Sequence, residues 1–166
     1  MGDLVVQETG ENRSIVAVRI RGTISARKEA RDTLELLHLN RNHRAVLIDS
    51  RPSFVGMLKT VQGYVSWGEA SMEVVNKLIS QRGRLLGNKK PTAEYLQEIG
   101  YKTIEDLAKA VFDCRVEYWR LPNIQPAFKL PPPTKGFRGN IKKAYRAGGE
   151  LGYQGEKINE LVKRMV

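Results

Sequence analysis

Cysteine is almost absent from this chain, because Cys114 is the only one in 166 residues. A single thiol excludes an internal disulfide, so we expect a hydrophobic core and a reducing compartment such as the cytosol. No apolar run approaches the roughly 20 residues that a membrane-spanning helix needs. The first residues, MGDLVVQETGEN, have neither the basic region nor the apolar stretch of a secretory signal, so we predict no export.

Residue patterns that support catalysis or metal binding are scarce as well. The two histidines, His38 and His43, fall in one expected loop without a set of carboxylates. The stretch Gly83–Lys90 lacks both the spacing of a phosphate loop and a preceding strand. The glycine-rich stretch Gly149–Gly155 follows no expected strand, which argues against a dinucleotide site. We therefore predict no enzyme activity, no cofactor, no metal and no small-molecule substrate.

Acidic residues are few relative to basic ones, 18 against 28, which gives a net charge of +10. Such an excess predicts an anionic partner, nucleic acid ahead of a membrane surface. The imbalance is local, because Tyr118–Gly149 holds seven cations and no acid. Lysine and arginine in such a stretch can neutralise phosphates, and the interleaved aromatics Phe137, Tyr145 and Tyr153 could stack on unpaired bases. The alternative is a basic linker whose aromatic residues are anchored on the core.

Hydrophobic periodicity predicts a β-α-β-α-β unit in residues 14–69. Strands are expected near 14–20, 44–49 and 64–67, with helices near 26–37 and 53–61. Thr23 or Ser25 is the expected cap of the first helix. Two such crossovers favour a mixed or parallel sheet with both helices on one face, which leaves the other face to solvent or a partner. We assign Arg19 and Arg21 to that open face.

The rest of the chain is predicted to be helical and then extended. Residues 71–117 read as helices capped by Ser71, Thr92 and Thr103, with a basic loop near 84–91. Residues 118–166 read as a basic Gly/Pro-rich arm that ends in a helix with an apolar stripe, which packs on the core. The predicted divisions are therefore 1–70, 71–117 and 118–166, in an α+β fold.

The basic residues of these surfaces are the candidate RNA-binding set. On the first helix alone the evidence is even, because Glu29, Asp32 and Glu35 could pair with its cations. The candidates are Arg19, Arg21, Arg27, Lys28, Arg31, Arg51, Arg82, Arg84, Lys89, Lys90, Lys129, Lys135, Arg138, Lys142, Lys143 and Arg146.

Several segments resemble one known family along the entire chain. They are VRIRGT, ARKEARDTLELLHLNRNHRAVLID, PSFVGMLKTVQGYVSWGE, VNKLISQRG and FRGNIKKAYRAGGELGYQGEKINELVKRM. The sequence resembles large-subunit ribosomal protein L-thirty, which is called L-seven in eukaryotes. The helices and basic arm after the third strand resemble the archaeal or eukaryotic form, and the missing basic N-terminal extension favours the archaeal form.

The resemblance implies a ferredoxin-like core that binds and organises large-subunit ribosomal RNA. It also implies a cytoplasmic, ribosomal location, contact with neighbouring ribosomal proteins, and proximity to the 5S RNA. An alternative from the residues themselves is a regulator that binds duplex DNA through a helix-turn-helix-like pair at 92–114. Its second helix is acidic, and phosphates would repel it.

Overall fold

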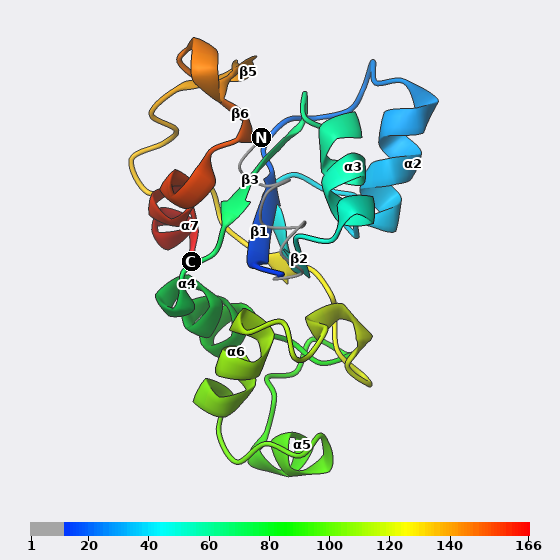
Figure 1. Cartoon of the computed structure of the whole chain (residues 1–166), viewed down its shortest axis with the longest axis vertical. Helices are drawn as coiled ribbons and strands as arrows, with labels where there is room; N and C mark the ends of the chain where they lie inside the picture. The colour runs from blue at the N-terminus through cyan, green and yellow to red at the C-terminus, as the bar shows by residue number, and fades with distance from the viewer. Residues whose placement is uncertain (1–11) are drawn as a thin grey trace.

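The computed structural model describes residues 12–166 and has one six-stranded sheet, in the order β4-β2-β1-β3-β6-β5 (Figure 1). The strands are β1 (Ser14–Arg19), β2 (Arg44–Asp49), β3 (Val65–Glu69), β4 (Phe128–Lys129), β5 (Asn140–Ala144) and β6 (Gly149–Tyr153). Strand β1 is antiparallel to both β2 and β3, whereas β6 is parallel to β3 and to β5. The predicted mixed α+β sheet is therefore confirmed, and its parallel alternative is wrong.

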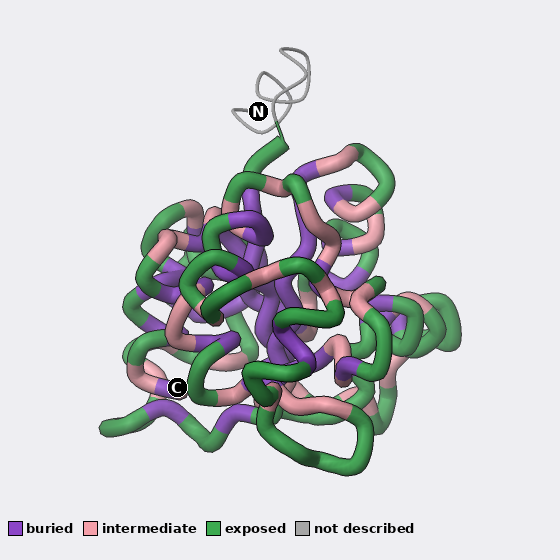
Figure 2. The backbone as a smooth tube through the Cα atoms, turned by 90° about the horizontal axis from the view of Figure 1, so that it is seen from below, coloured by how far each residue is buried: buried purple, intermediate pink, exposed green. Residues whose placement is uncertain are grey.

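Strand β1 lies between β2 and β3, and every one of its residues is buried. Figure 2 shows the buried residues gathered in the middle of the molecule. Ile15 and Ala17 pack in one hydrophobic cluster with helices α2 (Lys28–Leu36) and α3 (Pro52–Thr60). Val16 and Val18 pack in a second cluster on the opposite face. A strand that is apolar in both registers is typical of a sheet covered on both sides.

The second face is covered by helices from the later part of the chain. Helices α4 (Met72–Lys77), α6 (Ile104–Phe112) and α7 (Ile158–Met165) contribute buried side chains to this cluster, together with the π-helical turn η1 (Leu78–Arg82). Helix α5 (Ala93–Glu98) lies at the far end of the molecule (Figure 1). The expected caps Ser71, Thr92 and Thr103 each accept a backbone N–H.

Two predictions about the first strand–helix unit are wrong. The sheet has no open face at β1, and Arg19 is buried rather than solvent-facing. Its guanidinium donates to Arg21 O at 3.1 Å, Leu39 O at 3.1 Å and Thr23 Oγ1 at 2.9 Å. The predicted cap is wrong as well: α2 begins after Arg27, so neither Thr23 nor Ser25 occupies the N-cap position, and Thr23 Oγ1 accepts from Arg19.

The last third of the chain contributes to the sheet instead of remaining an extended arm. β4 pairs with β2, and β6 pairs with β3 at Ser66–Gly152 and Trp67–Tyr153. The carboxylate of Glu150 accepts from the backbone N–H of Gly139 at 2.8 Å. The apolar stripe of α7 is fully or almost fully buried in the core cluster that contains Val16 and Val18; its residues are Ile158, Leu161, Val162 and Met165.

Glycine 56 lies at an exposed position inside α3, and a Cβ added there would meet nothing within 4 Å. Replacing Gly56 by Ala should therefore stabilise the fold by about 0.5–1 kcal/mol, because alanine has the higher helix propensity. Urea unfolding of both proteins measures the difference. A loss of stability would show instead that the glycine is needed for close packing.

The side chain of His43 packs beside Phe137, and its burial should make the free energy of unfolding depend on pH. Its backbone has a positive φ of 63°, its ring stacks 6.1 Å from Phe137, and its buried Nδ1 has no partner among the described residues. Burial lowers the pKa of His43 below its usual 6.5. The unfolded chain therefore binds this proton first as pH falls, so stability decreases below about pH 6.5.

Unfolding titrations on either side of that pH measure this effect. The pH dependence should shrink in His43→Gln and persist in His38→Gln, because His38 is the other histidine of the chain. An unchanged pH dependence in His43→Gln would contradict the assignment.

Candidate nucleic-acid interface

A cluster of exposed cations lies on β5 and on the 3₁₀ turn η3 (Tyr145–Ala147) that follows it. Lys142, Lys143 and Arg146 are exposed, and none forms an ion pair with another residue of 12–166. Gly148 ends the turn in the left-handed region with φ 82°. The next residue, Gly149, lies so close that an added Cβ would be 1.9 Å from Lys143 O. This tight turn fixes the position of the three cations. The segment β5–η3 that carries them is called the projection below.

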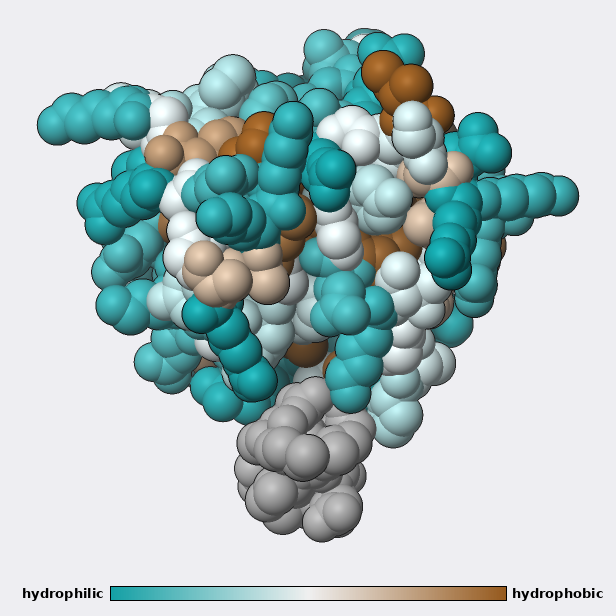
Figure 3. Space-filling model, turned by 90° about the horizontal axis from the view of Figure 1, so that it is seen from above, coloured by the Kyte–Doolittle hydropathy of each residue, from teal (hydrophilic) through white to brown (hydrophobic). Residues whose placement is uncertain are grey.

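A groove of about 550 Å³ separates this projection from helix α3. Arg21, Lys142 and Arg146, all predicted RNA-binding residues, line it together with Arg13 and Lys59. Apolar side chains of the sheet also line it, and Figure 3 shows apolar surface between hydrophilic side chains at this end of the molecule. The structure thus brings together cations from distant parts of the sequence, as an anion-binding surface requires.

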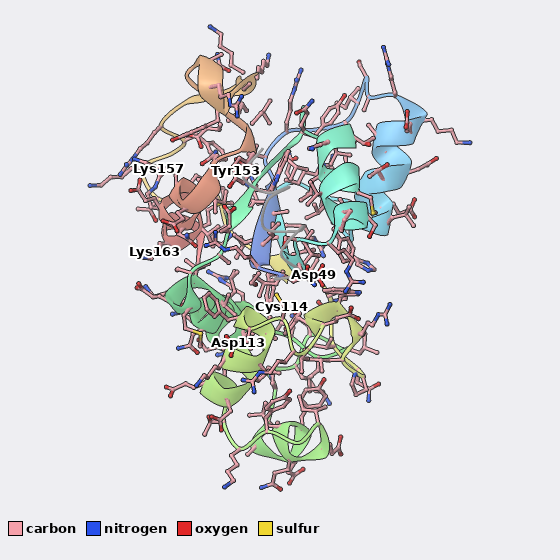
Figure 4. The ribbon with its side chains drawn as sticks, in the orientation of Figure 1. Asp49, Asp113, Cys114, Tyr153, Lys157 and Lys163 are labelled. Carbon is pink, nitrogen blue, oxygen red and sulfur yellow. The ribbon has the colours of Figure 1, made fainter. Side chains whose placement is uncertain are left out.

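One carboxylate, Glu69, also lines the groove. Tyr153, the last residue of β6, donates its hydroxyl to Glu69 Oε1 at 2.5 Å, and Figure 4 shows it beside β3. The rings of Tyr145 and Tyr153 are 37% and 42% exposed. Two tyrosine rings therefore remain accessible beside the cations, as predicted for base stacking, whereas Phe137 packs against His43 and the core.

Two of the lining cations, Arg13 and Lys59, were missed by sequence reasoning. Lys59 lies on the exposed side of α3, and Arg13 directly precedes β1. The polar face of the expected helix at 53–61 contained the signal for Lys59. For Arg13 no local pattern exists, because only the tertiary arrangement places it in the groove.

The remaining predicted cations lie outside the groove. Arg27, Lys28 and Arg31 are exposed at the start of α2, on the other side of α3 (Figure 1). Arg82, Arg84, Lys89 and Lys90 follow the π-helical turn η1 or belong to it. Arg84 donates to Gln81 O and Gly83 O, at 3.2 and 2.7 Å, so part of its function is to hold this loop. Lys129, Lys135 and Arg138 are exposed, and Arg138 pairs with Glu160 at 3.4 Å.

Arg51 serves the fold through a compact charged cluster. It donates to Asp49 Oδ1 at 2.8 Å and to Glu117, and its guanidinium lies 4.9 Å from the ring centroid of Phe54. Hydrogen bonds to Asp49 first, and then to Glu117, raise the pKa of Arg51 above its usual value. Because both carboxylates already neutralise it, Arg51 is a weaker candidate for RNA than the groove cations.

Cys114 lies two residues after the end of α6, with a positive φ of 58°. Figure 4 shows it beside Asp49. Burial, and secondarily the charges of Asp49 and Asp113, raise the pKa of the Cys114 thiol to about 11. It therefore stays protonated and has the character of a packing residue.

The helix pair α5–α6 does not support the alternative of a helix-turn-helix-like regulator that binds duplex DNA. Its second helix buries Leu107 and Val111 in the core, and its exposed side begins with Glu105 and Asp106. Phosphates would be repelled by this side. Among residues 12–166 no helix is long and apolar enough to cross a membrane.

The comparisons with known proteins point to one family. The family model described as Ribosomal protein L30p/L7e matches residues 15–65, from β1 to the start of β3. Large ribosomal subunit protein uL30 of Thermofilum pendens is 44% identical over 91% of this chain and 97% of its own length. The proteins of the same name from Methanopyrus kandleri and Archaeoglobus fulgidus are 42% and 44% identical, over 89% of this chain and 100% and 97% of theirs. This chain belongs to the ribosomal protein L30p/L7e family.

Proposed function

We propose that this chain is a structural constituent of the large ribosomal subunit that binds and organises ribosomal RNA and so supports subunit assembly and translation. The observation that carries the proposal is the convergence of five cations on one groove, in a chain whose relatives are named large ribosomal subunit proteins. The family confirms that the chain is not an enzyme and that it acts on the ribosome in the cytoplasm.

The mechanism is electrostatic and depends on shape. Lys142, Lys143 and Arg146 extend from a backbone that is hydrogen-bonded into the sheet, so they reach RNA phosphates without first ordering a flexible segment. Each phosphate that they neutralise releases condensed counterions, which favours binding. The exposed cations at the start of α2 and in the loop after η1 would contact further RNA.

The proposal also includes contacts with neighbouring ribosomal proteins and with 5S RNA. Ile24, Leu36 and Leu86 are 100%, 70% and 62% exposed, which is unusual for aliphatic side chains and supports contact with neighbouring ribosomal proteins. Contact with 5S RNA is proposed from the family resemblance. The divisions 1–70, 71–117 and 118–166 also stay a prediction, although all three contribute to one hydrophobic cluster.

Neutralising the projecting cations should weaken RNA binding in a salt-dependent way. The logarithm of the RNA-binding constant falls linearly with the logarithm of salt concentration. We expect Lys142→Gln/Lys143→Gln/Arg146→Gln to make this slope less steep by about 2, since each lost phosphate contact removes about 0.7–0.9. Binding to large-subunit ribosomal RNA at several salt concentrations measures the slope.

The matched control is Lys102→Gln/Lys109→Gln, which neutralises exposed cations near α6. It should leave the slope close to that of the unmodified chain. If the triple variant also keeps its slope, the projection is not the RNA-binding surface.

A further inference from the structure

We propose that the groove between α3 and the β5–η3 projection is a site for an unpaired nucleotide of RNA, with the base against the tyrosine rings and the phosphate among the cations. This inference rests on the proposed function and names the RNA conformation that the site takes.

The charges of the groove are arranged for a phosphate. Arg21 and Lys59 belong to the α3 side, Lys142 and Arg146 belong to the projection, and Arg13 comes from the chain before β1. Cations from two walls can contact one phosphate from different directions, which a flat basic face cannot do. Five cations line the groove against a single carboxylate, Glu69, so the lining is net positive.

The aromatic residues supply a surface for a base. Tyr145 stands in the projection beside Lys142 and Arg146, and Tyr153 stands at the end of β6. Tyr153 is held in place by the hydrogen bond to Glu69 and by Trp67, whose ring centroid is 6.3 Å away. Trp67 itself is buried, so it supports Tyr153 from below without being exposed to a ligand. The ring of Tyr153, held in this way, can stack on a base without losing much conformational freedom.

The size of the groove selects an unpaired base over a duplex. Its volume of about 550 Å³ is in the range of pockets that hold small ligands, and it is lined on both walls. In an RNA helix the base faces are stacked, and only phosphates and groove edges are accessible to protein. The tyrosine rings can therefore be used only when the base is unstacked, as in a loop or bulge.

The test uses the full chain and a short single-stranded oligoribonucleotide that carries a fluorescent adenine analogue. The same sequence in a duplex, and adenosine monophosphate alone, are the other two ligands. We expect fluorescence quenching and tighter binding with the single strand than with the duplex, and weaker binding of the mononucleotide because it lacks neighbouring phosphates. Tyr145→Leu, which preserves an apolar side chain at an exposed position, should weaken single-strand binding about tenfold and remove most of the quenching.

Two further variants separate charge from stacking. Arg146→Gln should weaken binding but leave quenching of the bound state intact, and Lys109→Gln on α6 should change neither. Equal quenching by Tyr145→Leu, or equal affinity for duplex and single strand, would overturn the proposal. It would also be overturned if the full chain showed no binding of the single strand.

The outcome is distinguishable from failure of the proposed function. A chain that enters large subunits but never quenches the probe would overturn the groove site alone. A chain that quenches the probe but never enters large subunits would overturn the ribosomal role and leave the groove site standing.

Discussion

Replacing Arg19 by Glu should unfold the protein, with a loss of more than about 4 kcal/mol, and not merely weaken RNA binding. The guanidinium donates to two backbone carbonyls and one hydroxyl in the buried end of β1. A carboxylate there would leave these acceptors unpaired and would add a negative charge facing carbonyl oxygens. Urea unfolding followed by circular dichroism measures the loss.

Neighbouring substitutions separate structure from binding. Arg21→Glu, two residues later and lining the groove, should keep the fold and weaken RNA binding. Arg19→Lys keeps the charge but cannot donate to all three acceptors, so it should be intermediate in stability. If Arg19→Glu folds normally and loses only RNA affinity, Arg19 faces RNA and the buried assignment is wrong.

Gly68→Ala should be strongly destabilising although it adds only one methyl group to the sheet. An added Cβ would be 1.9 Å from the backbone oxygen of Gly155 and 2.8 Å from Ile158 Cγ2. Neither the backbone nor the start of α7 can move without breaking the contact between β3 and the C-terminal segment. We expect a loss of about 3 kcal/mol or more, at the upper end of overpacking costs.

The matched control for this substitution is Gly63→Ala. An added Cβ at Gly63 meets nothing within 4 Å, so the change should be close to neutral in the same unfolding titration. Equal stability of the two variants would mean that the C-terminal segment does not pack against β3 as described.

The β-α-β-α-β unit could be predicted because its apolar periodicity is simple. The Arg44–Asp49 strand has the predicted bounds, and the helix bounds differ by only one or two residues. The position of Arg19 could not be predicted from alternation. Its burial depends on Leu39 and Thr23 supplying acceptors, and these lie in other segments.

The strands after residue 118 were missed for a related reason. β4 has two residues, and β5 is largely exposed and basic, so neither shows an apolar alternation. β6 is rich in glycine, which hides the strand pattern, although Leu151 and Glu150 are buried in it. Their pairing is set by tertiary contacts to β2 and β3, which one local window does not contain.

The presence of a basic surface could be predicted from the sequence, but its position on the fold could not. The stretch without acids predicted Lys142 and Arg146 among the RNA-binding residues, and both line the groove. The groove itself needed Arg13 and Lys59 to meet them across the sheet. Which of the predicted cations contact RNA stays a prediction, because burial distinguishes only Arg19 and ion pairs distinguish only Arg51 and Arg138 within residues 12–166.

The most direct measurement is the sedimentation of the tagged chain with ribosomal particles from cells that express it. We predict that the unmodified chain sediments with large subunits, and that Lys142→Glu/Arg146→Glu, folded equally well by circular dichroism, moves to the top of the gradient. The unmodified chain remaining at the top, or the folded variant entering large subunits as well as the unmodified chain, would contradict the account.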